Sequence, residues 1–154
     1  MPRNYGFPDR EQTRVIWSRD LSRASFTMYA NLKVSRLATG QPGESSKLCL
    51  SCHDGTTAVD SYGGSPGTRF VRGSASIGTD LRDDHPIGLV YPSGAAGYNH
   101  PATFPAGGVR LMRSDGISNR VECSSCHDPH GSGYDRFLRA PMTGSALCLQ
   151  CHNV

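Results

Sequence analysis

Three copies of one five-residue motif contain every cysteine in the chain. They are Cys49-Leu-Ser-Cys52-His53, Cys123-Ser-Ser-Cys126-His127 and Cys148-Leu-Gln-Cys151-His152. C-x-x-C-H is the attachment motif of haem c, in which the two thiols add to the porphyrin vinyl groups and the histidine becomes the proximal iron ligand. The sequence therefore predicts three covalent haems c, held by six cysteines and by the proximal ligands His53, His127 and His152.

Two other uses of paired cysteines fit the pattern less well. A structural zinc site needs two C-x-x-C halves around one tetrahedral ion and gives no reason for a histidine after every pair. Disulfides within C-x-x-C are typical of redox catalysts, and the thioredoxin-like strand context of those catalysts is absent from this sequence. Because histidine makes up only 6 of 154 residues, its presence after all three pairs favours haem.

The three remaining histidines, His85, His100 and His130, equal the predicted irons in number. This parity favours three bis-histidine haems, although a lone histidine is more often a surface or hydrogen-bonding residue. His85 precedes a proline, which favours an extended backbone, and a strand-like apolar run follows. His100 lies in a glycine-rich loop, and the only argument for it as a ligand is the equal number of remaining histidines and predicted irons. Methionine is the competing ligand type, and the candidates are Met28, Met112 and Met142.

His130 lies only three residues after the proximal ligand His127, at most about 10 Å along the backbone. This span is too short to pass round the disc of its own haem. We therefore expect His130 to bind a different iron, which would require two haems to lie close together.

Composition predicts a small, loop-rich fold. Charged residues make up 19% and hydrophobic residues 36% of the 154 positions, with 18 Gly and 10 Pro. We expect a single domain (1–154), with an N-terminal arm of turns and short strands lying over haem faces (1–44) and a haem-binding body (45–154). Short helices at the C-x-x-C-H motifs and short β-strands would surround haems that form most of the core, so the chain should fold only with haem attached.

Several local elements are predicted. Ser45 or Ser46 can cap a short helix that ends at His53, and residues 144–152 resemble a copy of that first site. Strand-like runs are expected at residues 69–71 and 87–91, and a hairpin is expected around Ser114-Asp115-Gly116, with strands at 109–112 and 120–122.

The charge pattern is evidence on the binding partners, and the predicted cofactor is evidence on the cellular compartment. The formal charge is +3, but the arginines are scattered, so nucleic-acid binding is not expected. No apolar run is long enough to span a membrane, and the first residues lack a signal-peptide segment. Because haem c is attached outside the cytoplasm, we expect a periplasmic or extracellular protein whose signal peptide has been removed.

The motifs in context resemble the multihaem c-type cytochromes with a doubled C-x-x-C-H motif. The resemblance covers about residues 14–153 and rests on segments 48–55, 84–88, 121–131, 137–139 and 145–152, with Trp17 and Thr27-Met-Tyr29 in the arm. It implies a secreted electron carrier, with relatives that polymerise into extracellular haem filaments, or nanowires. It also implies that His85 and His130 are distal ligands. An additional C-x-x-C-H-x-P-H-G unit, common in relatives before the tryptophan, is missing, so His100 or a neighbouring subunit's histidine must supply the remaining ligand.

These observations predict electron transport rather than enzymatic catalysis. Three closely spaced bis-histidine haems need no substrate pocket, and the expected partners are redox proteins or extracellular electron acceptors. A soluble carrier and a subunit of a homopolymeric filament both remain open. The alternative is a haem enzyme or gas sensor with one open iron position, which would follow if neither His100 nor a methionine serves as a ligand.

Overall fold

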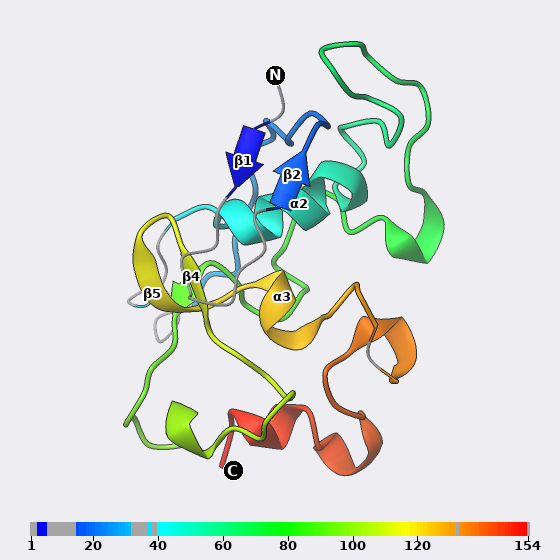
Figure 1. The fold of residues 1–154 in the computed structure, drawn as a ribbon. Coiled ribbons are helices and arrows are strands. Elements are labelled where there is room, and N and C mark those ends of the chain that lie inside the picture. The colour runs from blue at the N-terminus through cyan, green and yellow to red at the C-terminus, as the bar shows by residue number, and fades with distance from the viewer. Residues whose placement is uncertain (1–2, 6–14, 32–36, 38–39, 132, 154) are drawn as a thin grey trace.

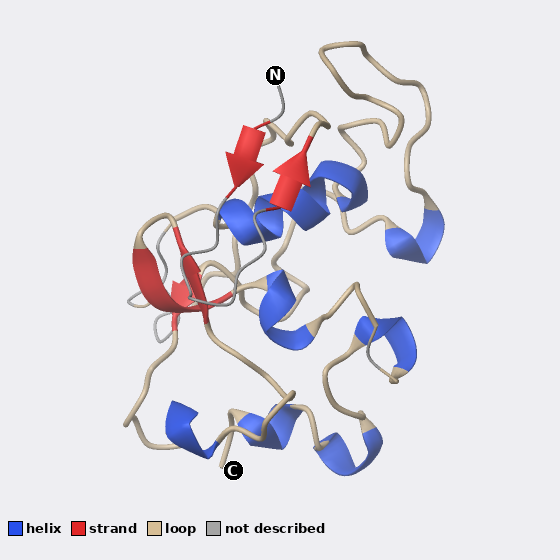
Figure 2. Cartoon of the chain, viewed as in Figure 1, coloured by secondary structure: helices blue, strands red, loops and turns tan. Residues whose placement is uncertain are grey.

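The computed structural model describes residues 3–5, 15–31, 37, 40–131 and 133–153, which are mostly loops and turns (Figures 1 and 2). The helices and strands of that part are β1 (Arg3–Tyr5), β2 (Val15–Trp17), α2 (Glu44–His53), η1 (Gly73–Ala75), β3 (Leu89–Val90), η2 (Pro101–Thr103), β4 (Met112–Ser114), β5 (Ile117–Val121), α3 (Cys123–Cys126), η3 (Asp135–Phe137), η4 (Thr143–Ser145) and η5 (Cys148–Gln150), where η marks a 3-10 helix. The expected loop-rich fold with a few short helices and strands is confirmed.

The predicted hairpin is present, with its strands at Met112–Ser114 and Ile117–Val121 instead of the expected 109–112 and 120–122. It belongs to a three-stranded antiparallel sheet with the strand order β3-β5-β4, in which β5 is the central strand. Asp115 and Gly116 make the turn with φ of 52° and 76°. Positive φ at both central residues matches the right-handed twist of the flanking strands, which is why an Asp-Gly pair closes this hairpin. The expected run at 87–91 supplies β3, with Leu89 opposite Val121. Because β5 leads directly into α3, the sheet positions the second motif.

Helix α2 carries the first motif at its C-terminal end, as predicted, but it is not capped by a serine. Gly43 is the N-cap, and both Ser45 and Ser46 lie inside the helix and are buried. Ser46 uses its hydroxyl in tertiary hydrogen bonds, to the Glu122 carboxylate and the backbone of Cys123. The prediction of a serine cap was wrong because this side chain serves the contact between two motifs.

The strand expected at residues 69–71 is absent from this described segment, which is a loop. The Asp60 carboxylate replaces strand pairing there by accepting the backbone N–H groups of Thr68 and Arg69, both at 2.9 Å. In the arm, β1 and β2 pair antiparallel with Arg3 opposite Trp17. Most of the remaining arm before residue 15 lies outside the described residues, and its expected position over haem faces stays a prediction.

The buried apolar side chains form three small clusters rather than one core. Their buried members are Phe26, Leu50 and Leu81 in the first, Leu89, Tyr91 and Val121 in the second, and Val109, Ala140 and Leu147 in the third. Each cluster contains a residue within or shortly before one C-x-x-C-H motif. No helix in the described part of the chain has the length and apolar character needed to cross a bilayer.

Candidate covalent haem sites

The three motifs follow one another through the molecule. In Figure 1, α2 lies above α3, and the turn η5 lies below them near the C-terminus. The second motif forms α3, with His127 as its C-cap residue, and the third motif begins in η5. The third motif is therefore not a structural copy of the first. Gly144 and Ser145, with φ of 60° and 58°, break the backbone before residue 148, so a long helix like α2 does not form there.

The sulfurs of the first and second motifs are in direct contact. A hydrogen bond joins the thiols of Cys49 and Cys123, and this bond is the main cause that raises the pKa of Cys49 and lowers the pKa of Cys123. Burial raises the pKa of Cys49 further. These shifts describe free thiols, because a thioether sulfur carries no ionisable proton.

The second and third motifs are also neighbours through their sulfurs. Burial raises the pKa of Cys126 to about 11, and the nearby sulfur of Cys151 contributes to the increase. Both cysteines pack against the third apolar cluster. Burial likewise raises the pKa of Cys151. The second motif thus lies between the other two, with Cys123 near the first motif and Cys126 near the third.

Two predicted proximal histidines each direct Nδ1 at a backbone carbonyl oxygen. His53 Nδ1 lies 2.7 Å from the carbonyl oxygen of Ala75, and His127 Nδ1 lies 2.8 Å from that of Arg136. A carbonyl only accepts hydrogen bonds, so Nδ1 carries the proton and the lone pair of the neutral ring is on Nε2. Metal-binding histidines characteristically donate their other N–H in this way.

A strained segment supplies the carbonyl that orients His127. Arg136 and Phe137 have φ of 53° and 58°, in the left-handed region that side-chain-bearing residues rarely adopt. Phe137 also accepts the backbone N–H of Asp128 at 2.7 Å. Arg139 fixes the segment by donating to Ser124 O and to the Asp128 carboxylate, both at 3.1 Å.

The third predicted proximal ligand, His152, is positioned mainly by tyrosines and a backbone bridge. The Tyr98 ring lies 5.0 Å from the His152 ring, and residues 98 and 152 form an isolated antiparallel bridge. The Tyr91 hydroxyl lies 2.8 Å from the carbonyl oxygens of both Asn99 and Cys151. This hydroxyl ties the segment after β3 to the residue immediately before His152.

Of the predicted distal ligands, His85 lies beside a proximal histidine. Its ring centroid is 6.4 Å from that of His152. Its Nδ1 is 3.1 Å from the carbonyl oxygen of Pro86. Burial lowers the pKa of His85, and the nearby His152 lowers it further, which favours the neutral form that binds metal.

His130 and His100 lie in different surroundings. The His130 side chain is 91% exposed, with Nδ1 3.7 Å from the Asp128 carboxylate. His100 caps η2, where its Nδ1 accepts the backbone N–H of Ala102 at 3.2 Å. An accepting Nδ1 places the proton of neutral His100 on Nε2, opposite to the arrangement at His53 and His127. Both histidines remain predicted ligands.

The three candidate methionines occupy different environments. Met28 packs against the first apolar cluster, and Met112 is buried within β4 at 7% exposure. Met142 is 56% exposed. Met28 and Met112 therefore fill the interior of the folded chain.

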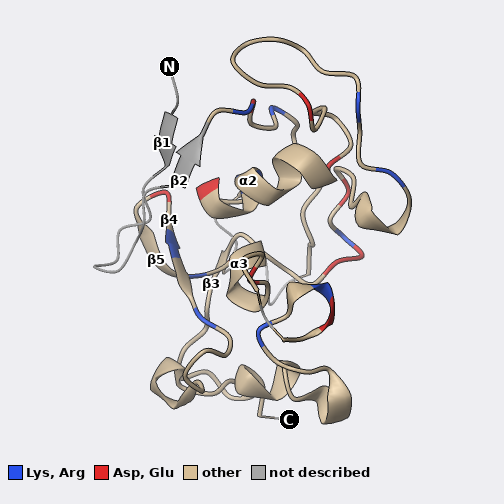
Figure 3. Cartoon of the chain, turned by 45° about the vertical axis from the view of Figure 1, so that its right-hand side comes forward, with Lys and Arg blue, Asp and Glu red and all other residues tan. Residues whose placement is uncertain are grey.

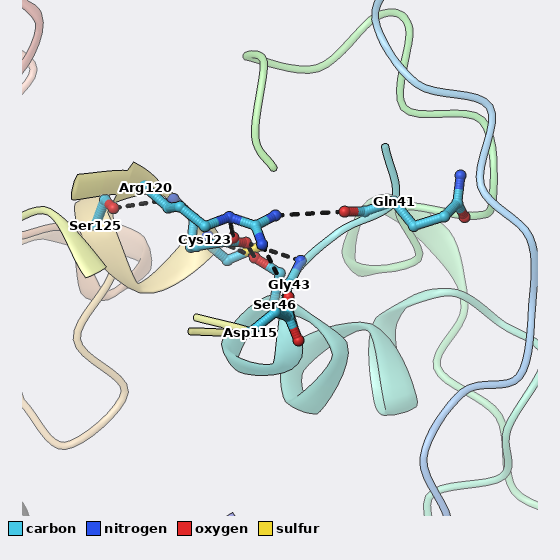
Figure 4. Close-up of polar contacts among 8 residues, drawn as sticks. Gln41, Gly43, Ser46, Asp115, Arg120, Cys123 and Ser125 are labelled. Carbon is cyan, nitrogen blue, oxygen red and sulfur yellow. Dashed lines mark hydrogen bonds and ion pairs between the residues drawn. The ribbon is translucent and has the colours of Figure 1, made fainter. Parts of the chain in front are cut away.

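A buried ionic network, not predicted from the sequence, joins the first two motifs (Figure 4). Arg120 and Glu122 are each 1% exposed, and Arg120 Nε lies 2.8 Å from Glu122 Oε1. Glu122 Oε2 accepts from Ser46 Oγ at 2.5 Å and from Gly43 N at 3.3 Å. The Ser46 hydroxyl in turn accepts Cys123 N at 3.0 Å. The start of α2 is therefore bonded directly to the start of α3.

Close packing and charge balance both constrain this network. A Cβ atom at Gly43 would collide with Glu122 Oε1 and the Ser114 side chain, so only glycine fits there. Burial raises the pKa of Glu122, against the lowering effects of the Ser46 hydrogen bond and the Arg120 charge. Glu122 and Ser125 also form a reciprocal cap on α3. The sequence signal for this cap was an acidic residue three positions before a serine.

These side chains fit haem c. Each motif presents two thiols and an imidazole within one turn, and the first two imidazoles have their Nε2 lone pair available. Among the described residues, no three His, Cys, Asp or Glu side chains converge to hold a metal ion by themselves. A haem iron needs fewer protein ligands, because the porphyrin supplies the equatorial ones. The residues named would thus hold haem through thioethers and one imidazole per motif.

The arrangement of thiols and imidazoles is compatible with covalent haem attachment. The family model described as the doubled CXXCH motif matches residues 117–154, which contain the second and third motifs. This match supports a c-type cytochrome that binds haem c for electron transfer. The first motif lies outside the matched span. A comparison with curated proteins found no match.

Proposed function

We propose that this protein transfers electrons through three covalently bound haems c arranged in a row. The proposal is supported by the proximity of successive motifs. Ser46 of α2 accepts the backbone N–H of Cys123 at 3.0 Å, the thiols of Cys49 and Cys123 are close enough to interact, and Cys126 and Cys151 pack against one apolar cluster. Groups attached to neighbouring sulfurs are held close to each other. The chain thus provides spacing and ligation, which are the tasks of the protein in a cofactor-based electron carrier.

Attachment consumes the thiols as such. Each Sγ–H adds across one vinyl double bond, so that a carbon–sulfur bond forms and the hydrogen goes to the other vinyl carbon. Haem c, when bound, supplies a one-electron iron couple whose potential depends on the axial ligands and their hydrogen bonds. Ala75 and Arg136 contribute here, because their carbonyls accept from His53 and His127 and thereby raise the basicity of the ligating nitrogens.

We assign the distal positions to His85, His130 and His100, in decreasing order of support. His130 is exposed, which leaves it accessible to an iron outside its own motif, in this molecule or in a neighbouring copy. His100 needs its proton to move from Nε2 before it can bind metal. This observation favours the second candidate function, a haem enzyme or gas sensor with one open iron.

The compartment follows from the cofactor. Haem c is attached outside the cytoplasm, so we propose a periplasmic or extracellular protein, with redox proteins or extracellular acceptors as partners. This proposal depends on the covalent attachment and is tested together with it.

One surface favours self-assembly. Residues 91–109 and 140–153, which we call the uncharged pole, contain no Asp, Glu, Lys or Arg. They surround the third motif and appear without charge colours at the lower end of Figure 3. Leu149 and Met142 are 46% and 56% exposed on it. A polypeptide surface without charged side chains can approach a second copy without repulsion between side chains, which supports a filament or other homopolymer.

The central proposal is tested on the protein produced with a haem-attachment system. Mass spectrometry should give the chain plus three haems, and the oxidised protein should show low-spin electron paramagnetic resonance signals without a spectral change when carbon monoxide is added to the reduced form. Fewer than three haems per chain would contradict the proposed arrangement of three haems in a row. A high-spin signal together with carbon monoxide binding would favour the alternative function, a haem enzyme or gas sensor with one open iron.

Self-assembly is tested separately by electron microscopy and light scattering over a range of protein concentrations. The Met142→Lys variant places a charge on the uncharged pole outside the haem motifs and should reduce assembly, whereas Ile117→Lys, on the exposed hairpin, is the matched control. A wild-type protein that stays monomeric at every concentration would rule out the homopolymer.

A further inference from the structure

The rings of His85 and His152 lie close together, although their segments are far apart in the chain. Their centroids are 6.4 Å apart, and their planes are inclined by 64°. His85 precedes β3, whereas His152 follows η5 and closes the third motif. The family resemblance does not say which iron His85 would bind.

The separation of the two rings matches that of two ligands on one metal. Each bond from a metal to an imidazole nitrogen is about 2 Å, so two opposed nitrogens lie about 4 Å apart. The half ring beyond each nitrogen brings the centroids to roughly 6 Å, close to the observed value. Edge-to-face packing of aromatic rings covers the same range, so the distance needs a second observation to carry an assignment.

The second observation is the hydrogen bond at His85. Pro86 O can only accept, so the contact at 3.1 Å places the proton on Nδ1 and the lone pair on Nε2. His53 and His127 show the same arrangement, whereas His100 shows the opposite one. His85 is therefore prepared to bind metal and not merely packed against another ring.

The backbone also connects His85 to the third motif. Six residues after His85, the Tyr91 hydroxyl contacts the carbonyl oxygens of Asn99 and Cys151. Asn99 donates its side-chain amide to Leu149 O at 2.9 Å and its backbone N–H to Cys151 O at 2.8 Å. This bonding fixes the segment that carries His85 to the turn that carries Cys148 and Cys151.

We propose that His85 and His152 are the two axial ligands of the haem attached at Cys148 and Cys151. The inference rests on the proposed function, because it requires a haem at the third motif. It assigns one complete ligand pair. The distal positions of the first and second motifs are thereby left to His100, His130 or another group.

The test uses the haem-loaded full-length protein with the His85→Ala substitution. Haem content should stay at three per chain, while one haem becomes high-spin and binds carbon monoxide. Asp83→Ala, an exposed neighbour, is the matched control and should leave all spectra unchanged. Inclined imidazole planes also give a strongly anisotropic low-spin signal, so the most anisotropic signal of the wild type should disappear in His85→Ala.

A second background identifies which iron is affected. The double substitution Cys148→Ser and Cys151→Ser removes the third haem, and adding His85→Ala to it should produce no new high-spin signal. A high-spin haem in that background would overturn the assignment, since His85 would then bind another iron. Three low-spin haems in the single variant would overturn it as well.

The variant His85→Met separates ligation from structural support. If residue 85 reaches the iron, the sulfur should raise the potential of one haem and add a sulfur-to-iron band in the far red. Absence of the band while three haems are bound would contradict the assignment. If the wild-type protein binds no haem, the proposed function itself is refuted.

Discussion

At the scale of single residues, hydrogen bonds distinguish histidines that the sequence treats alike. His85 and His100 each precede a proline, and both were predicted as distal ligands by counting. The fold gives His85 a carbonyl partner and His100 an amide partner, which place the proton on opposite nitrogens. The identity of the partner depends on the local turn, so a count of histidines could not provide it.

Tyr91 makes the third site sensitive to alkaline pH. Burial raises the pKa of its phenol to about 12, so the folded state favours the protonated form. The corresponding stability is complete below about pH 10, the ordinary value, and is lost as pH rises toward 12. We expect an optical transition of the haem in that interval, because a phenolate cannot donate to Asn99 O or Cys151 O.

The control for this transition is Tyr91→Phe, which has no group to titrate at that position. Its haem spectrum should stay constant over the same pH interval, at the cost of about 1 kcal/mol of stability for the lost hydrogen bond. An unchanged alkaline transition in the variant would show that another group is responsible.

At the scale of elements, the positions of helices and strands were easier to predict from the sequence than the contacts that join them. The Asp-Gly turn fixed the hairpin, and the helix ending at His53 formed as expected. The Ser46 cap failed because Glu122, 76 positions away, takes its hydroxyl. The third motif failed to copy the first because Gly144 and Ser145 break the helix before it. The first failure comes from a tertiary hydrogen bond and the second from residues with a left-handed backbone conformation. Local sequence patterns encode neither.

The Glu122 network should be essential for the junction of α2 and α3. Glu122→Ala removes one of the two ion-pair partners of the buried Arg120, which keeps Asp115 at 2.8 Å. It also leaves Ser46 Oγ and Gly43 N without their acceptor, so a loss of about 1–3 kcal/mol is expected. Glu122→Gln preserves the shape and the hydrogen bonds to Ser46 and Gly43, so a smaller loss is expected. Chemical unfolding of the haem-loaded variants, followed by circular dichroism, measures both. Equal stability of Glu122→Ala and wild type would contradict a structural role.

At the scale of the whole molecule, three small clusters replace a continuous core. Each contains three buried apolar residues beside one motif. The composition predicted this shortage of apolar material, but the division into three parts depends on which loops fold over which motif. The order of the motifs in space likewise came from side-chain contacts, such as that between Cys49 and Cys123, which no spacing in the sequence specifies.

We predict that the chain does not fold without haem. Clusters of this size bury too little apolar surface to offset the conformational entropy of a mostly irregular chain. Protein made without haem attachment should show the far-ultraviolet circular dichroism and rapid amide exchange of an unfolded chain. The haem-loaded protein is the control, and a cooperative thermal transition in the apoprotein would contradict the prediction.

The bond between Ser46 and Glu122 also has a consequence for biogenesis. The chain is synthesised from its N-terminus, so Cys49 and Cys52 are complete some seventy residues before Glu122 exists. A ten-residue helix is marginal by itself in water, and α2 obtains the partner for its first turn only at Glu122. Because the chain is expected to fold only with haem, the attachment machinery should meet the first motif as a flexible peptide. Its recognition should then depend on the five motif residues and not on surrounding tertiary structure.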